Sequence, residues 1–132
     1  RIKPKDGSFA DDVASGDEVV REAAALLDAW ALEAGVETRL TRRAKQFKDG
    51  DGTHLFQYYP MYGTVEVPVQ RFTEANRPDL HERVRAAFQA LTKNRLSRKH
   101  LQLPARDVVD NWEQFVETAV PVLRTATQQL DS

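Results

Sequence analysis

Apolar residues recur at helical spacing over residues 16–34, and this pattern predicts the first helix of the chain. Ser15 and Glu18 have the spacing of a capping box, and Gly35 supplies the left-handed conformation that often ends a helix. The apolar positions cover more than one stripe, so we expect the helix to pack on a sheet and also to touch a second helix, with Trp30 largely buried. These positions are Val19, Val20, Ala23, Ala24, Leu26, Leu27, Trp30 and Ala31.

A change to alternating apolar and polar residues after this helix predicts strands. Residues 36–45 alternate in this way and are predicted to form the first strand. Residues 48–52 tolerate positive φ and predict a turn into a second strand, residues 54–59, so that the two strands form a hairpin. A third strand is predicted over residues 64–72. Pro68 predicts that this strand lies at a sheet edge or contains a bulge, because proline cannot donate to a ladder.

The second half of the chain returns to helical spacing. Residues 76–91 predict a helix that begins near a proline, which is favoured in the first helical turn. A basic connector, residues 93–100, follows, and residues 101–103 are compatible with a short additional strand. The last helical pattern covers residues 108–120. Pro121 removes one backbone donor and predicts a kink or a split in this element.

Together these elements predict an α+β domain in which a small three- to four-stranded antiparallel sheet packs against an N-terminal helix and two C-terminal helical segments. Residues 1–14 are predicted to be a linker or a flexible N-terminal segment, and residues 15–132 a single domain. Because the chain begins with Arg1 and has the length of one ordinary domain, we interpret it as excised from a larger protein. Frequent Ala, Arg and Val favour a bacterial source.

Composition and motifs exclude several classes of function. The chain has no cysteine, which excludes disulfides, thiolate nucleophiles and cysteine-ligated metals and is typical of a cytoplasmic protein. Its longest apolar run, residues 23–27, is too short to cross a membrane. Glycine-rich nucleotide motifs and nucleophile elbows are absent from the sequence. An enzyme would need a site that leaves no local motif, so we expect a non-catalytic protein without a cofactor.

Metal binding is not predicted either. Residues 49–53 begin like a calcium loop, but His54 replaces its central glycine and Pro60 its bidentate glutamate. A tight hairpin turn is therefore the favoured interpretation. The three histidines, His54, His81 and His100, lack the spacing of zinc ligands.

The formal net charge of −1 hides a basic middle between two acidic ends. Residues 39–106 carry 14 Lys and Arg against 6 Asp and Glu, a net charge of +8. Residues 1–38 carry 4 against 9, and residues 107–132 carry 1 against 5. Segregated charge creates local fields that select partners even in a nearly neutral molecule. The basic middle therefore favours an anionic partner, either DNA or RNA.

Two basic groups are the candidate binding residues. Alternation along the first predicted strand places Arg39, Arg43 and Lys45 on the side away from the core, where a row of cations fits a phosphate backbone. The connector 93–100 carries the second group. The predicted nucleic-acid-binding residues are Arg39, Arg43, Lys45, Lys48, Tyr62, Arg95, Arg98 and Lys99. Alternatively, these cations serve solubility or pair with the acidic helices at the two ends of the chain.

Aromatic residues beside a basic groove would add base stacking. In the second predicted strand either Phe56 and Tyr58 or Leu55 and Tyr59 face the core, and the pattern does not decide between the two pairs. We expect most rings to be buried, because a small sheet covered by helices needs bulky residues inside. Tyr62, in the following turn, is the ring expected to be exposed.

The sequence supports three functions. The first is a non-catalytic binding module of a larger protein that binds nucleic acid through the basic strand face and the 93–100 connector. The second is a protein-interaction or assembly domain, in which the broad apolar surface of the first helix or of the helix containing Trp112 pairs with another chain or with a further domain of the parent chain. The third is an enzyme with an unrecognised site.

Overall fold

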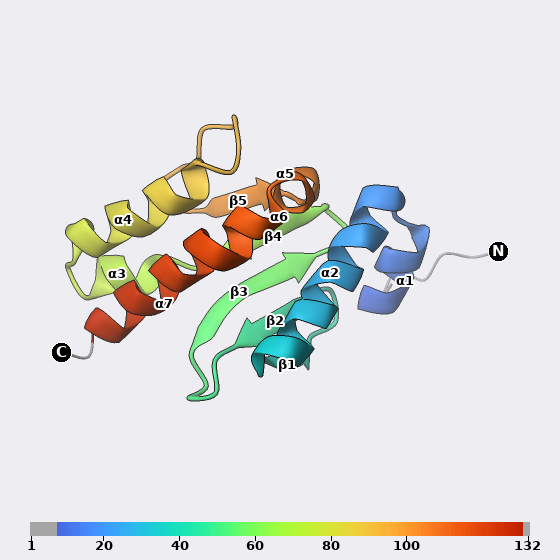
Figure 1. Ribbon diagram of the computed structural model, residues 1–132, viewed down its shortest axis with the longest axis horizontal. Helices are drawn as coiled ribbons and strands as arrows, with labels where there is room; N and C mark the ends of the chain where they lie inside the picture. The colour runs from blue at the N-terminus through green and yellow to red at the C-terminus, as the bar shows by residue number, and fades with distance from the viewer. Residues whose placement is uncertain (1–7, 131–132) are drawn as a thin grey trace.

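The computed structural model, which describes residues 8–130, contains a five-stranded antiparallel sheet whose strands follow one another in chain order, β1-β2-β3-β4-β5. The strands are β1 Glu37–Leu40, β2 Lys45–Lys48, β3 His54–Tyr59, β4 Thr64–Val67 and β5 Leu101–Pro104. The long helices lie across one face of this sheet (Figure 1). The predicted α+β class is therefore confirmed, and the sheet has one strand more than the largest number predicted.

The helices fall into an N-terminal pair, a central pair and a C-terminal series. They are α1 Phe9–Ser15, α2 Glu18–Ala34, α3 Gln70–Glu74, α4 Pro78–Gln89, α5 Ala105–Asp110, α6 Trp112–Gln114, the π-helix η1 Phe115–Ala119 and α7 Val120–Gln129. The predicted helix 76–91 is thus present as α4, with Pro78 in its first turn. None of the helices in the described part of the chain is long and apolar enough to span a membrane.

The N-terminal pair begins earlier than predicted. Ser8 and Asp11 form the capping box, and it starts α1, so residues 9–14 are helical where a linker was predicted. Residues 1–7 of that linker prediction lie outside the described residues. Helix α2 is capped instead by Asp17, whose carboxylate accepts a hydrogen bond from the amide of Val20 at 3.0 Å. Its predicted end is confirmed, because Gly35 has φ 69° in the left-handed region.

The predicted first strand, residues 36–45, is wrong as a single element. It is divided into β1 and β2 by a tight turn, in which the amide of Thr41 donates to the carbonyl oxygen of Ala44 at 2.8 Å. The Thr41 hydroxyl also accepts from the amide of Ala44 at 3.1 Å. A side chain that satisfies local backbone groups favours a turn over a continuous strand. The turn was not predicted from the sequence because its residues, 41–44, include no glycine or proline.

The turn predicted over residues 48–52 and the strand predicted over residues 54–59 are present, but the strand that pairs with β3 is β2, Lys45–Lys48, and not residues 36–45. Asp49 and Thr53 close the turn, with the Asp49 amide donating to the Thr53 carbonyl oxygen at 2.8 Å. Gly52 has φ 88°, a conformation that favours glycine. Arg124 of α7 donates to the carboxylate of Asp49 at 2.9 Å, so the turn is fixed to the C-terminal helix.

The third strand also differs from its prediction. Strand β4 ends at Val67, one residue before Pro68, and the chain then enters α3. Strand β4 is not an edge, because it pairs with β3 on one side and with β5 on the other. Proline ends this strand instead of lying within it, which removes the conflict between an absent donor and a central position.

Strand β3 contains a β-bulge at Leu55. Phe47 pairs with Phe56, whereas the next residue of β2, Lys48, pairs with His54, so Leu55 has no partner in β2. An inserted residue of this kind bends the strand and changes the direction of a side chain. Leu55 and Phe56 are consecutive in sequence, yet both are fully buried.

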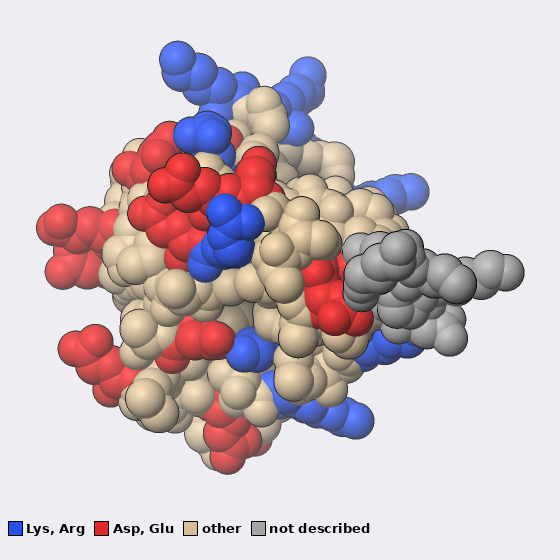
Figure 2. All heavy atoms as spheres, turned by 90° about the vertical axis from the view of Figure 1, so that its right-hand side faces the viewer, with Lys and Arg blue, Asp and Glu red and all other residues tan. Residues whose placement is uncertain are grey.

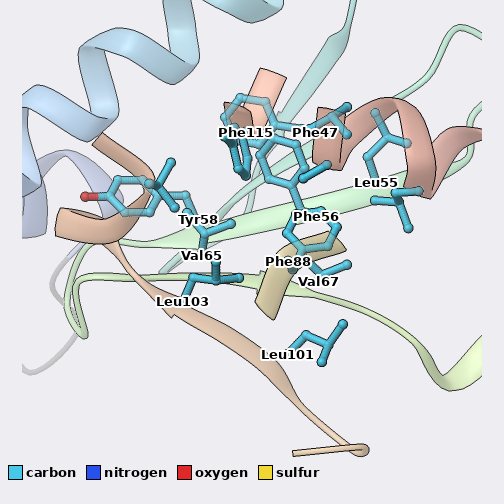
Figure 3. Packing of buried hydrophobic residues seen from close by; sticks show 14 of the residues in the cluster. Phe47, Leu55, Phe56, Tyr58, Val65, Val67, Phe88, Leu101, Leu103 and Phe115 are labelled. Atoms are coloured by element: carbon cyan, nitrogen blue, oxygen red, sulfur yellow. The ribbon is translucent and has the colours of Figure 1, made fainter. Parts of the chain in front are cut away.

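The bulge settles which residues of β3 face the core. Phe56 and Tyr58 point to the helices, Leu55 joins them on that side, and Tyr59 is half-buried (Figure 3). The hydroxyl of Tyr58 donates to the carbonyl oxygen of Val20 in α2 at 2.8 Å. Burial raises the pKa of Tyr58, which keeps this donor protonated.

Aromatic rings connect the sheet to helices from both ends of the chain. The ring of Phe56 lies 4.8 Å from that of Phe47, 5.6 Å from that of Trp30 and 5.4 Å from that of Phe115, between centroids. Phe115 in turn stacks on Trp112 at 5.6 Å. A continuous series of contacts therefore runs Trp30, Phe56, Phe115, Trp112, from α2 through the sheet to the C-terminal helices.

The C-terminal segment is divided near Pro121, as predicted. The division takes the form of a π-helical turn, η1, in which the amide of Val120 donates to the carbonyl oxygen of Phe115, five residues earlier. Pro121 then lies in the first turn of α7, where its missing amide costs little.

Two cations of the predicted basic strand face point to the helices instead. Both carboxylate oxygens of Asp12 in α1 accept from Arg43 at 2.9 Å, and Asp12 is only 4% exposed. Lys45 donates to Asp28 of α2 at 2.8 Å, and its ammonium lies 5.2 Å from the ring centroid of Phe9. The alternative interpretation of these two cations, internal pairing with the acidic N-terminal helices, is therefore confirmed.

The centre of the aromatic series should dominate stability. Phe56→Ala should lower the free energy of unfolding by about 3–5 kcal/mol, because it opens a cavity among three rings. Urea denaturation measures this change. Leu32→Ala, at a position 88% exposed, is the matched control and should cost about 0.5 kcal/mol or less. Equal losses for the two variants would contradict the assigned core.

Charge reversal should affect stability differently at Arg43 and at Arg39. Arg43→Glu should lower the free energy of unfolding by about 2 kcal/mol or more, because the buried carboxylate of Asp12 loses its donor and meets a like charge. Arg39→Glu, at an exposed position of β1, should change stability by about 0.5 kcal/mol or less. Thermal or urea unfolding of both variants tests the difference, and two equally stable variants would show that the ion pair contributes nothing.

Candidate functional site

The residues predicted to bind nucleic acid do not share one surface. Arg39 lies on the edge strand β1, and Arg43 and Lys45 are held by carboxylates of α1 and α2. Lys48 is half-buried at the end of β2, and Tyr62, in the turn after β3, is 68% exposed as expected.

The second predicted group lies at the far side of the sheet. Arg95, Arg98 and Lys99 precede β5, the edge opposite β1. Four strand spacings separate the two edges, about 19 Å at the usual spacing of about 4.8 Å. Figure 2 agrees: Lys and Arg side chains project in separate groups at the top and the lower right, while carboxylates gather on the left. The structure therefore does not bring the two basic groups together.

The sheet face opposite the core carries a row of polar residues that crosses all five strands in register. The row consists of Arg39, Gln46, Gln57, Glu66 and Gln102. Glu66 accepts from Gln57 at 2.6 Å and from Gln102 at 2.9 Å, and Gln57 also donates to the hydroxyl of Tyr59 at 2.9 Å. The central amides thus have partners within the row. The carboxylate of Glu66 near its centre would repel a phosphate backbone.

A groove lies between α2 and the C-terminal helices. Its volume is about 520 Å³. It is lined by Leu26, Ala29, Trp30, Glu33 and Ala34 from α2 and by Trp112 and Val116 from α6 and η1. We call it the tryptophan groove. Most of its walls are apolar. Trp30 packs between α2 and the sheet as expected, and both Trp30 and Trp112 leave part of their surface exposed to the groove.

The floor of the tryptophan groove belongs to the core. Trp30 and Trp112 are the two ends of the aromatic series that passes through Phe56 and Phe115. Their inner faces therefore rest on buried rings, while their remaining surface faces the groove. Rings held in this way lose little conformational freedom when a partner covers them, which is typical of binding hot spots.

The two helix segments that form the tryptophan groove are acidic, and Glu33 lies in the groove lining. The two segments that form it, residues 22–34 and 107–123, contain no Lys or Arg. Five of their carboxylates form no ion pair with any residue in the described part of the chain: Glu22, Glu33, Asp110, Glu113 and Glu117. Glu113 shares a hydrogen bond with Glu117 and, with its own charge, raises the pKa of the Glu117 carboxyl. The two segments that line the groove thus carry a net negative charge.

The sequence indicated both apolar helix surfaces that form this groove, but it did not indicate that the two surfaces lie side by side. The apolar stripes of both helices were visible as possible pairing surfaces, and the acidic ends of the chain were visible in the charge distribution. Trp30 and Trp112 are 82 positions apart, so no local pattern could show that they line one groove. Residues 22–34 and 107–123 both lack Lys and Arg, and this shared feature is the sequence signal that could have suggested that they line one groove.

The described residues hold no group of three or more His, Asp and Glu side chains that could bind a metal ion. No protein-family model, curated protein or solved structure matches this chain.

Proposed function

We propose that this domain is a protein-interaction module that docks a cationic amphipathic helix of a partner protein in the tryptophan groove. One observation carries the proposal: two indole rings that are held against the core line the groove, and the helix segments that form it contain five carboxylates without an ion pair and no Lys or Arg. Apolar anchors in the groove supply affinity, and charges at its margin select a basic partner.

The dimensions and lining favour a helix as the occupant. A volume of about 520 Å³ admits a few side chains instead of a whole domain. A helix presents apolar side chains at i, i+3, i+4 and i+7 along one stripe, which suits an apolar groove lined by two helical segments. Lys and Arg on the flanks of such a helix would face Glu33 from α2 and Glu113 and Glu117 from the C-terminal segment.

Nucleic-acid binding, the first function expected from the sequence, has less support than the second. Arg43 and Lys45 already pair with carboxylates, and the remaining basic groups lie at opposite sheet edges. The polar row on the open sheet face contains Glu66 near its centre. A continuous strip of cations would have favoured a nucleic acid. The protein-interaction hypothesis needs no such strip.

The test uses the intrinsic fluorescence of the protein, because the chain contains 2 tryptophans and both line the groove. The probe is a helical peptide of Leu and Lys that contains no Trp or Tyr. We expect it to change the emission saturably, with a dissociation constant in the micromolar range, about −8 kcal/mol at 1 μM. A Leu and Glu peptide of the same length should not bind. No saturable change with the Lys peptide would refute the proposal.

Two matched variants separate groove binding from general attraction. Ala29→Arg places a long cation at an exposed position of the groove, and Ala10→Arg places the same cation at an exposed position of α1. We expect Ala29→Arg to weaken peptide binding by at least about tenfold, equivalent to about 1.4 kcal/mol, and Ala10→Arg to leave it nearly unchanged. Equal losses would mean that the peptide senses only net charge.

Peptide affinity should also depend on pH. The pKa of Glu117 is raised by Glu113, so its protonation begins at a higher pH than that of an ordinary glutamate. Lowering the pH removes negative charge from the groove margin, and affinity for the Lys peptide should fall in step. Glu117→Gln should reduce this pH dependence in the same fluorescence titration. A pH profile identical in the variant and the parent would contradict a contact near Glu117.

A further inference from the structure

The connector 93–100, which looked like a loose basic loop in the sequence, has a defined conformation. Gln89 of α4 accepts from the amide of Leu96 at 3.0 Å and donates to the carbonyl oxygen of Asn94 at 2.7 Å. The side chain of Leu96 is buried. At the other end, the hydroxyl of Ser97 accepts from the amide of His100 at 2.9 Å. The loop is therefore fixed on α4 by one side chain and closed by a local turn.

This conformation places three arginines around one cleft. Arg95 and Arg98 flank the buried Leu96 and, together with Arg85 of α4, line a hollow of about 390 Å³. The remaining lining comes from Ser97 and from Glu82. We call this hollow the arginine cleft. It shares no lining residue with the tryptophan groove, so the two hollows are separate sites.

The arginine cleft has an excess of positive charge. Glu82 is its one carboxylate, and Arg85 holds it with two hydrogen bonds of 2.9 and 2.6 Å. This pair, with the nearby charge of Arg98, lowers the pKa of Glu82 and keeps it ionised. Arg95 and Arg98 form no ion pair or hydrogen bond with any residue between Ser8 and Leu130. Two guanidinium groups therefore remain available to a ligand.

We propose that the arginine cleft binds a phosphate group, with Arg95 and Arg98 as its main ligands. Guanidinium groups present paired donors that match the oxygens of phosphate, and they keep their charge at every physiological pH. The Arg85 and Glu82 pair forms part of the cleft wall. The hollow is within the size range of small-ligand sites, so it admits the phosphate of a nucleotide or of a nucleic-acid backbone.

The test titrates the isotopically labelled protein with two probes at constant ionic strength, inorganic phosphate and a short oligothymidine. Nuclear magnetic resonance detects the guanidinium signals of the arginines and the amide signals of residues 93–100. We expect saturable shifts confined to this region, with a dissociation constant of about 1 mM or below for at least one probe. Tighter binding of the oligothymidine identifies a nucleic-acid backbone as the source, and tighter binding of phosphate identifies a small ligand. Both results support the site.

Variants distinguish a built site from diffuse attraction. Arg98→Gln and Arg95→Gln each remove one exposed cation and should weaken the stronger probe by at least about tenfold. Arg83→Gln, on the same helix as Arg85 but bonded to Gln129 at 3.0 Å, is the matched control and should leave binding unchanged. Saturable shifts that fall equally in all three variants would overturn the proposal. The absence of saturable shifts with both probes would overturn it as well.

Discussion

The contact of Phe56 with three other rings is the interaction on which the rest of the structure depends. It joins the middle of the sheet to α2 through Trp30 and to the C-terminal helices through Phe115. Segments from both ends of the chain therefore meet on one residue of β3. The bulge at Leu55 adds a second apolar side chain beside Phe56, so β3 contributes two consecutive fully buried residues to the core. Because the series ends at two half-buried indoles, the core extends to the surface without a polar layer in between.

Local signals account for the elements that the sequence predicted well. Gly35 ends α2 because only a residue tolerant of positive φ fits there, and the turn before β3 uses Gly52 for the same reason. The elements that were missed depend on contacts between distant residues. The local pattern predicts that Arg43 points away from the core. In the structure Arg43 instead bonds to Asp12, which is 31 positions away in the chain. The turn at Thr41 is formed by a hydroxyl, which carries a weaker turn signal than glycine or proline.

The candidate sites show the same division. Charge segregation in the sequence indicated that the ends of the chain are acidic and the middle basic. On the face shown in Figure 2, carboxylates gather on the left and Lys and Arg side chains project mainly at the top and the right, with one basic group beside the carboxylates. What the sequence lacked was the sheet order, which sends the two basic groups to opposite edges. The tryptophan groove likewise depends on the packing of α2 beside the C-terminal segment. A stripe of apolar residues predicts that a helix face is covered, but not which part of it stays open.

The order of the strands has a consequence for how the molecule is assembled. The first four strands are joined by short turns, whereas residues 68–100 separate β4 from its partner β5. Closing a longer loop costs more entropy, so we expect the early hairpins to form first and β5 to dock late. Trp112 comes after β5 in the chain. A nascent or shortened chain would therefore present Trp30 alone, and a partner that requires both indoles would bind only the completed fold.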